Sequence, residues 1–205
     1  AQDKNGNTVL HEYALSTAVD GNITEKDKIC KILLKFGASL KITNNFGEVP
    51  LHYAFVPELF QIFLQEGAVC RARNERDESP VLYIMKVLVD VAFAGTSAIA
   101  ELADKGFVKT THNTSVVNAL NLLENLIKIL SQNKEAIKTV WIPDIKGNVA
   151  INLLLIAIRL GSYNLNCMQE LRTSFIKLLN EMLRGATPRE MKWTTKKGQS
   201  FLHML

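Results

Sequence analysis

Apolar residues recur at helical spacing along this chain, in segments that follow short polar turns. In residues 28–40 ("KICKILLKFGASL"), Ile29, Ile32, Leu33 and Phe36 keep the three-and-four spacing of a helix face. Residues 57–68 ("PELFQIFLQEGA") repeat the stripe and end in the same Gly-Ala pair, which is typical of a helix stop. No strand-like alternation of useful length competes with this pattern. We therefore predict a nearly all-helical chain whose apolar stripes face a core.

The polar turns that precede these helices share one frame, a glycine followed four residues later by Leu-His. It occurs at 6–11, 47–52 and 198–203 and accounts for three of the four histidines. Weaker copies lie at 74–85 and 144–155, and a hidden start is assigned near 111. About six starts with a mean period in the thirties indicate an array of helical repeats. A lone helix pair cannot bury its apolar face, so the units are expected to stack.

Local signals place the start of each first helix. Thr8, Ser79 and Ser200 are expected to cap free backbone N–H groups. Pro50 and Pro80 fall at the first helical position, where a missing N–H costs nothing. The glycines of the turns are expected to adopt positive φ: Gly6, Gly47, Gly147 and Gly198.

The phrases "GEVPLHYA" at 47–54, "GNTVLHEYA" at 6–14 and "LLKFGA" at 33–38 resemble the ankyrin repeat. The resemblance implies an all-α ankyrin-repeat solenoid of stacked helix pairs, with short β-hairpin fingers and irregular loop insertions. It covers residues 1–205 as a single domain of about five to six repeats, although 94–143 matches poorly and is assigned by length alone. The family uses its Leu-His imidazole to bond the finger backbone, which gives these histidines a structural role. Fingers and inner helices then form a concave surface for a protein partner.

The composition of the chain indicates its class of protein and the compartment to expect. A hydrophobic fraction of 47%, a charged fraction of 21% and a net charge of +4 are those of an ordinary globular protein. Three cysteines without a CxxC pair favour a reducing compartment, so a cytoplasmic location is expected. The chain is also expected to be a monomer. The longest apolar runs are too short to span a membrane. The turn-like opening "DKNGN" suggests a fragment of a longer protein.

Candidate chemistry is sparse. The sequence contains no closely spaced His or Cys residues of the kind that bind zinc, no phosphate-binding loop and no nucleophile elbow. We therefore expect no metal, no cofactor and no catalysis. The densest basic stretch contains Lys196 and Lys197 near Trp193. We interpret it as a solvated finger, and binding of nucleic acid or lipid there is the weaker alternative.

The candidate partner-binding residues are finger and inner-helix positions that the repeat logic leaves exposed. Phe46 is the most informative, because an aromatic side chain at a finger tip either anchors a partner or packs on the next finger. Trp141 is expected to pack beneath a finger. The candidates are Glu12, Tyr13, Asn45, Phe46, Glu48, Tyr53, Glu75, Arg76, Glu78, Lys146 and Asn148.

The leading functional hypothesis is a protein–protein interaction module without catalytic activity. The Asn- and Lys-rich composition and irregular repeats are similar to those of ankyrin proteins that intracellular bacteria deliver into host cells. That similarity implies an effector in the host cytoplasm. The alternative is the targeting domain of a larger enzyme whose catalytic region lies outside this chain.

Overall fold

A computed structural model describes residues 1–17, 23–93, 116–153 and 167–185 of the protein. The first unit contains α1 (Val9–Thr17) and α2 (Ile23–Lys35). The second contains a short 3₁₀ helix, η1 (Pro50–Tyr53), and α3 (Pro57–Gln65). Each first helix follows a polar loop, at 3–7 and 44–48, which we call a finger.

The later units have longer helices. The finger at 74–78 leads into α4 (Pro80–Phe93), and α6 (Val116–Gln132) packs on α3, α4 and α9. The short α7 (Lys134–Lys138) and η3 (Thr139–Trp141) then lead to a finger at 144–148. Helical residues 150–153 follow it, and α9 (Cys167–Gly185) is the last helix described.

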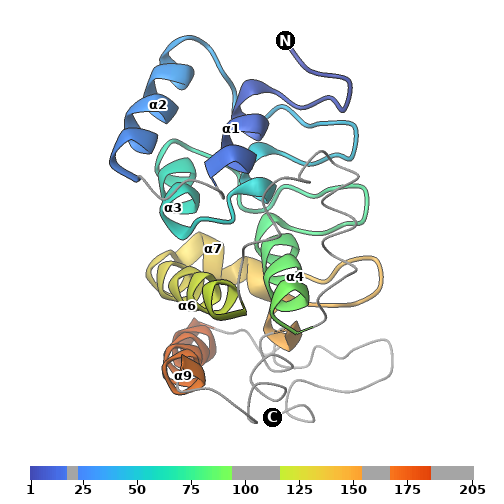
Figure 1. The fold of residues 1–205 in the computed structure, drawn as a ribbon. Helices are drawn as coiled ribbons and strands as arrows, with labels where there is room; N and C mark the ends of the chain where they lie inside the picture. The colour runs from blue at the N-terminus through green and yellow to red at the C-terminus, as the bar shows by residue number, and fades with distance from the viewer. Residues whose placement is uncertain (18–22, 94–115, 154–166, 186–205) are drawn as a thin grey trace.

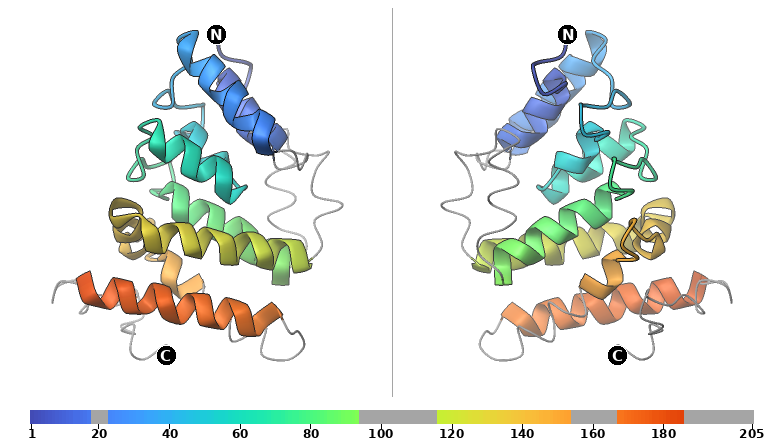
Figure 2. Two further views of the ribbon diagram at one scale, coloured as in Figure 1. Left: turned by 90° about the vertical axis from the view of Figure 1, so that its left-hand side faces the viewer. Right: turned by 90° about the vertical axis from the view of Figure 1, so that its right-hand side faces the viewer.

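The helices form two layers, and the fingers lie on one side of them. In Figure 1, α2, α3, α6 and α9 make an outer layer, and α1, η1 and α4 make an inner layer. The fingers project from the inner layer, on the side away from the outer helices. The views in Figure 2 show the units stacked in order from α1 and α2 to α9. The described elements are all helical, as predicted.

Helix starts and stops follow the predicted local chemistry except at Thr8, whose hydroxyl lies 2.8 Å from His11 Nδ1 instead of capping a backbone N–H group. Pro50 and Pro80 open η1 and α4, and the Ser79 hydroxyl accepts a hydrogen bond from the Leu82 amide at 3.3 Å. Gly37 ends α2 with a φ of 86°, a backbone shape that glycine adopts without strain. Beyond it, the Ala38 amide bonds back to the Leu33 carbonyl at 3.0 Å. Ala68 makes the same bond to Phe63 at 2.8 Å.

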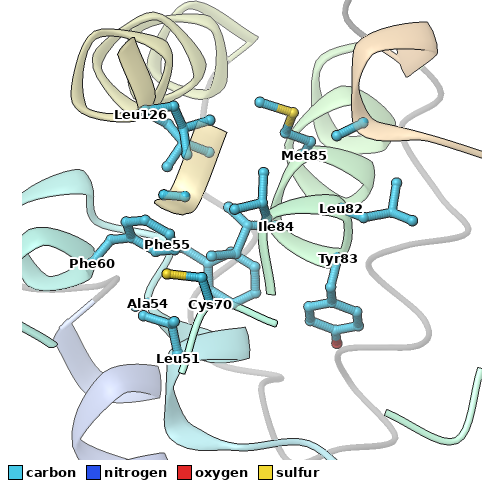
Figure 3. Close-up of a cluster of buried hydrophobic side chains, with 14 of the residues drawn as sticks. Leu51, Ala54, Phe55, Phe60, Cys70, Leu82, Tyr83, Ile84, Met85 and Leu126 are labelled. Atoms are coloured by element: carbon cyan, nitrogen blue, oxygen red, sulfur yellow. The ribbon is translucent and has the colours of Figure 1, made fainter. Parts of the chain in front are cut away.

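One continuous core runs between the two layers. Figure 3 shows Leu51 and Phe55 of the second unit, Phe60 of α3, Ile84 and Met85 of α4, and Leu126 of α6 in one cluster of buried side chains. All of these side chains are buried, and Cys70 joins them. Trp141 is also buried, as predicted. Because residues of one unit pack on those of the next, the core is shared along the stack.

The apolar stripe predicted for the first outer helix is wrong in part. Cys30 is buried, whereas Ile29, Ile32 and Phe36 are exposed. Phe36 follows the last residue of α2 and is 85% exposed. The other two lie on a helix at the end of the stack (Figure 1), so a helical apolar pattern there does not guarantee burial.

The prediction of β-hairpin fingers is not confirmed. The four fingers in the described ranges contain no strand, and each is a turn closed by its own hydrogen bonds. The degraded unit end at Gly106-Phe107 and the hidden start near 111 lie outside the described residues.

Candidate partner-binding surface

Each described finger is locked by the side chain at its first position. That side chain is an Asp or Asn whose Oδ1 accepts hydrogen bonds from the amides two and four residues later. For Asn44 the donors are Phe46 and Glu48, both at 3.0 Å. The same pair of bonds, at 2.7 to 3.0 Å, is made by Asp3, Asn74 and Asp144. Such side chain to backbone bonds hold the turn without a β-ladder.

The fourth position of each finger needs a left-handed backbone. Gly6, Gly47 and Gly147 have φ of 76°, 73° and 81°, and Asp77 takes that place in the third finger with φ of 60°. Space also requires the glycine at Gly6, where a Cβ would lie 2.5 Å from Oδ1 of Asn45. The predicted turn glycines are therefore confirmed at the three described positions.

Neighbouring fingers are joined by one backbone hydrogen bond each. The amide at position 2 of a finger donates to the carbonyl at position 3 of the preceding finger. The bonds join Asn45 to Asn5 at 3.0 Å, Glu75 to Phe46 at 3.1 Å and Ile145 to Arg76 at 3.3 Å. The fingers at 74–78 and 144–148 are therefore direct neighbours. The start of the separate repeat predicted between them, near 111, lies outside the described residues, and α6, α7 and η3 lie in the chain between these two neighbouring fingers.

The two described Leu-His histidines connect one unit to the next. His11 Nδ1 accepts from the Thr8 amide at 3.0 Å, so Nε2 carries the proton and donates to the Glu48 carbonyl at 2.8 Å. His52 repeats this arrangement between the Val49 amide (3.1 Å) and the Glu78 carbonyl (3.2 Å). Burial lowers the pKa of His11 below its ordinary value and lowers the pKa of His52 to about 4. Both imidazoles are therefore neutral structural groups, as the family resemblance implied.

Glu48 and Tyr53 are buried, so the prediction that they lie on an exposed surface is wrong. The Tyr53 hydroxyl donates to the Glu48 carboxylate, and the Asn44 amide reaches the same carboxylate at 3.2 Å. The Tyr53 ring packs edge-on against His11 at 5.9 Å and Tyr83 at 6.1 Å. Burial raises the pKa of the Tyr53 hydroxyl, which stays a donor. These side chains lock the finger onto the inner helix.

Glu78 is the second correction of the same kind. Its carboxylate is buried and accepts from the Asn74 amide at 2.9 Å. Lys86 of α4 lies at 3.0 Å and Arg76 at 3.3 Å, so the charge is paired from two sides. A buried carboxylate requires such partners, and this one is a structural anchor of the third finger.

The remaining predicted residues are exposed or half-buried. Tyr13, Phe46 and Arg76 are half-buried. Glu12 is exposed, and its carboxylate accepts a hydrogen bond from the side-chain amide of Asn7 at 2.8 Å. The other exposed residues are Asn45, Glu75, Lys146 and Asn148. Lys196, Lys197, Trp193 and His203 lie outside the described residues.

Exposure along each finger follows its internal register. Position 2 is exposed in all four described fingers: Lys4, Asn45, Glu75 and Ile145. Position 3 is half-buried except at Lys146, and position 5 is buried except at Asn148. Position 2 therefore forms a continuous row of tips.

The described residues give little support for a metal site, a reactive thiol or a membrane-spanning helix. No group of three or more His, Cys, Asp or Glu residues there could hold a metal ion. Cys30 and Cys70 are buried free thiols, and burial raises the pKa of Cys30 to about 11, so its reactive thiolate is scarce at neutral pH. None of the described helices combines the length and apolar character needed to cross a membrane.

Sequence reasoning missed the finger lock. The signal was present as an Asp or Asn three residues before the turn glycine, in "DKNGN", "NNFGE" and "DIKGN". The third finger, "NERDE", keeps the Asn and replaces the glycine by Asp77.

Comparison with known proteins bears on the first unit. A family model for the ankyrin repeat matches residues 5–45, which run from the first finger through α1 and α2 into the second finger. A search among curated proteins found no match. The match therefore bears on the first unit, and the same finger bonds recur at 44–48, 74–78 and 144–148.

Proposed function

We propose that this chain binds another protein through its row of finger tips and the adjoining inner helices, without catalysis of its own. Ankyrin repeats are in general protein–protein interaction modules. The observation that carries the proposal is the register of exposure, because position 2 of every described finger points into solvent while position 1 locks the turn. The row thus presents exposed side chains to a partner, and that of Asn45 also donates to the Lys4 carbonyl at 3.1 Å.

The chemistry of the row suits a protein partner. Lys4, Asn45, Glu75 and Ile145 offer in order a cation, an amide, an anion and an apolar side chain. A nucleic acid needs a continuous positive surface that neutralises successive phosphates. A row of mixed charge instead matches a partner with its own pattern of charged, polar and apolar groups.

The rigidity of the fingers favours tight recognition. Several hydrogen bonds hold the second finger internally. Two are accepted by Asn44 Oδ1, the Gly47 amide donates to the Asn44 carbonyl at 3.1 Å, and the Asn44 backbone amide donates to the Glu48 carbonyl at 2.9 Å. A surface that is ordered before binding loses less conformational entropy when a partner docks. The partner is therefore expected to meet preformed tips.

A finer function follows only from the family resemblance. An effector that acts on host proteins in the host cytoplasm remains a prediction, as does a targeting domain of a larger enzyme.

Site-directed photo-crosslinking tests the surface. A crosslinking amino acid replaces Glu75 or Lys146 on the finger tips, or Gln61 on α3 or Lys134 on α7 as controls. All four positions are exposed, so the replacement is expected to leave the fold intact. We expect the tip positions to trap the same partner protein from cell extract and the two outer positions to trap none of it.

A charge test then separates partner classes. In the double variant Glu75→Lys/Lys146→Glu the charge is reversed at one position of the row and at the exposed position 3 of the fourth finger, while net charge is kept, and crosslinking from Asn45 should fall sharply. Equal trapping from the outer positions would contradict the proposed surface. If the finger positions instead crosslink to nucleic acid, and moderate salt abolishes this crosslinking, the partner is a nucleic acid, which is the weaker alternative.

A further inference from the structure

The outer layer of helices carries a cavity between α3 and α6, which we call the amide cavity. It has a volume of about 180 Å³ and is lined by Gln61, Leu64, Gln65, Ile129, Gln132 and Asn133. Gln65 and Gln132 are the last residues of α3 and α6, so the cavity lies at the carboxyl ends of both helices. Figures 1 and 2 both show these two helices as neighbours in the stack. The cavity therefore belongs to the outer layer, and the fingers lie on the other side of the inner layer.

The lining of the cavity is polar but uncharged. Four of the six lining residues carry a side-chain amide, and none carries a charge. Leu64 and Ile129 are half-buried and pack against the shared core, so they add a small apolar surface. A bound ion would lose hydration here without gaining an opposite charge. The lining therefore suits a neutral ligand that has hydrogen-bonding groups of its own.

The amides of the cavity have hydrogen-bonding groups available for a ligand. The side chains of Gln61, Gln65 and Gln132 make no hydrogen bond to any described residue. Asn133 Oδ1 accepts from two backbone amides of α7, at 3.1 and 3.0 Å, which fixes the side chain in place. Its NH₂ group then remains as a donor, with no acceptor among the described residues.

The amides of α3 are not a general feature of the outer helices. Counted back from the glycine that follows each helix, Gln61 and Gln65 correspond to Lys31 and Lys35 of α2. Lys31 forms an ion pair with Asp27 at 2.9 Å. Neither helix packing nor the helix stop therefore requires an amide at these two positions.

The spacing of the amides matches that of an extended peptide. Gln61 and Gln65 lie four residues apart on one face of α3, which is a rise of about 6 Å. Alternate residues of an extended segment are about 6.6 Å apart and direct their N–H and C=O groups to the same edge. A side-chain amide offers both a donor and an acceptor, so each of these glutamines can pair with both backbone groups of one residue.

We propose that the amide cavity binds an extended, uncharged segment of a partner protein through hydrogen bonds to the backbone of that segment. The two amides of α3 pair with its first and third residues, and Gln132 and Asn133 pair with the second. The side chain of the second residue is small and apolar and contacts Leu64 and Ile129. A cavity of about 150 Å³ accommodates a benzene-sized group, so the volume is sufficient for such a side chain. This site goes beyond the row of finger tips and does not depend on it.

A peptide titration followed by NMR provides the test. Acetyl-Ser-Val-Ser-amide is added to the 205-residue chain while the side-chain NH₂ signals of Gln61, Gln65 and Gln132 are recorded. We expect saturable shifts of these signals at millimolar peptide. The same peptide methylated at its backbone nitrogens cannot donate and should bind at least about tenfold more weakly. Acetyl-Glu-Val-Glu-amide should also bind more weakly, because the cavity offers no opposite charge.

Two glutamine substitutions provide the matched controls. Gln65→Met keeps the length of the side chain and removes its hydrogen-bonding groups, so it should weaken binding at least about fivefold. Gln169→Met makes the same change on α9 and should leave binding unchanged. Both side chains are exposed, so the thermal midpoints of the two variants should stay close to that of the wild type.

Several results would overturn the proposal. They are an absence of shifts, equal binding of the methylated or the charged peptide, and equal binding by Gln65→Met and Gln169→Met. Crosslinking from the finger tips involves none of these residues, so either proposal can fail without the other. The outer crosslinking position Gln61 lines the cavity, and a protein trapped there is expected to differ from the one trapped at the tips.

Discussion

At the scale of single residues, the fingers combine one carboxylate with one amide at positions 1 and 5. The pairs are Asp3 with Asn7, Asn44 with Glu48, Asn74 with Glu78, and Asp144 with Asn148. In the last three the amide donates to the carboxylate, at 3.2, 2.9 and 2.8 Å. Either order satisfies the turn, because position 1 needs only an acceptor for the backbone amides. What each finger excludes is two acids together.

This complementarity gives a matched pair of substitutions. Asn44→Asp keeps the backbone acceptor but replaces the donor that faces the buried Glu48 carboxylate with a second negative charge. We expect it to lower the free energy of unfolding by about 3 kcal/mol. Asp144→Asn should cost less than about 1 kcal/mol, because Asn148 is exposed and can turn its amide. Urea unfolding at pH 7 measures both, and equal losses would contradict the acid–amide rule.

The neutral His52 predicts a loss of stability in mild acid. Its pKa is about 4 in the folded chain and about 6.5 when unfolded, so between these values the unfolded state binds more protons. Stability that is fully present above pH 6.5 is therefore lost as the pH falls toward 4. The pKa difference corresponds to about 3 kcal/mol, and His11 adds a loss of the same sign.

The variant His52→Asn isolates this effect. Asparagine occupies the equivalent position at Asn152 and does not titrate. The variant is expected to be less stable at pH 7.5 and to lose less stability between pH 7.5 and 4.5 than the wild type. Parallel curves of unfolding free energy against pH in the two proteins would show that His52 is not the group responsible.

At the scale of elements, the features predicted correctly from the sequence are those that the local backbone conformation determines. Gly47 and Pro50 were placed correctly because a positive φ and an unpaired first amide are properties of the turn itself. Tyr53 and Glu48 were misplaced because their burial depends on Tyr83 and His11, which come from other units. The apolar stripe of α2 failed for the same reason, since only a neighbouring unit decides whether a helix face is covered.

Two residues at one register position test this dependence on neighbours. Leu59→Ala should lower the free energy of unfolding by about 3 kcal/mol, because it opens a cavity in the shared core. Ile29→Ala should cost less than about 1 kcal/mol, since the side chain already contacts water. Denaturant unfolding of the two variants measures the contrast, and similar costs would indicate that α2 is covered in solution.

At the scale of the whole molecule, the fingers set the order of the units more reliably than sequence spacing does. Spacing alone placed a separate repeat between residues 74–85 and 144–155, because the interval is about twice the usual period. The bond from Ile145 to Arg76 places these two fingers side by side. In the described part of the interval, α4 and α6 are therefore the inner and outer helices of the third unit. Sequence could not show this, because loop length does not reveal which turns are neighbours.

Arg73 provides the test of that order. Its guanidinium donates to the Asp77 carbonyl at 2.6 Å and to the Pro143 carbonyl at 3.0 Å, so one side chain ties the third finger to the entry of the fourth. Arg73→Ala should lower the free energy of unfolding by about 2 kcal/mol, because it removes two hydrogen bonds from a charged donor. It should also speed hydrogen exchange at the Ile145 amide, far along the sequence. Arg71→Ala is the control, since its ion pair with Glu135 spans 3.6 Å between exposed groups and contributes little. If Arg73→Ala lowers the free energy of unfolding as expected but leaves hydrogen exchange at the Ile145 amide unchanged, the third and fourth fingers are not coupled through this contact.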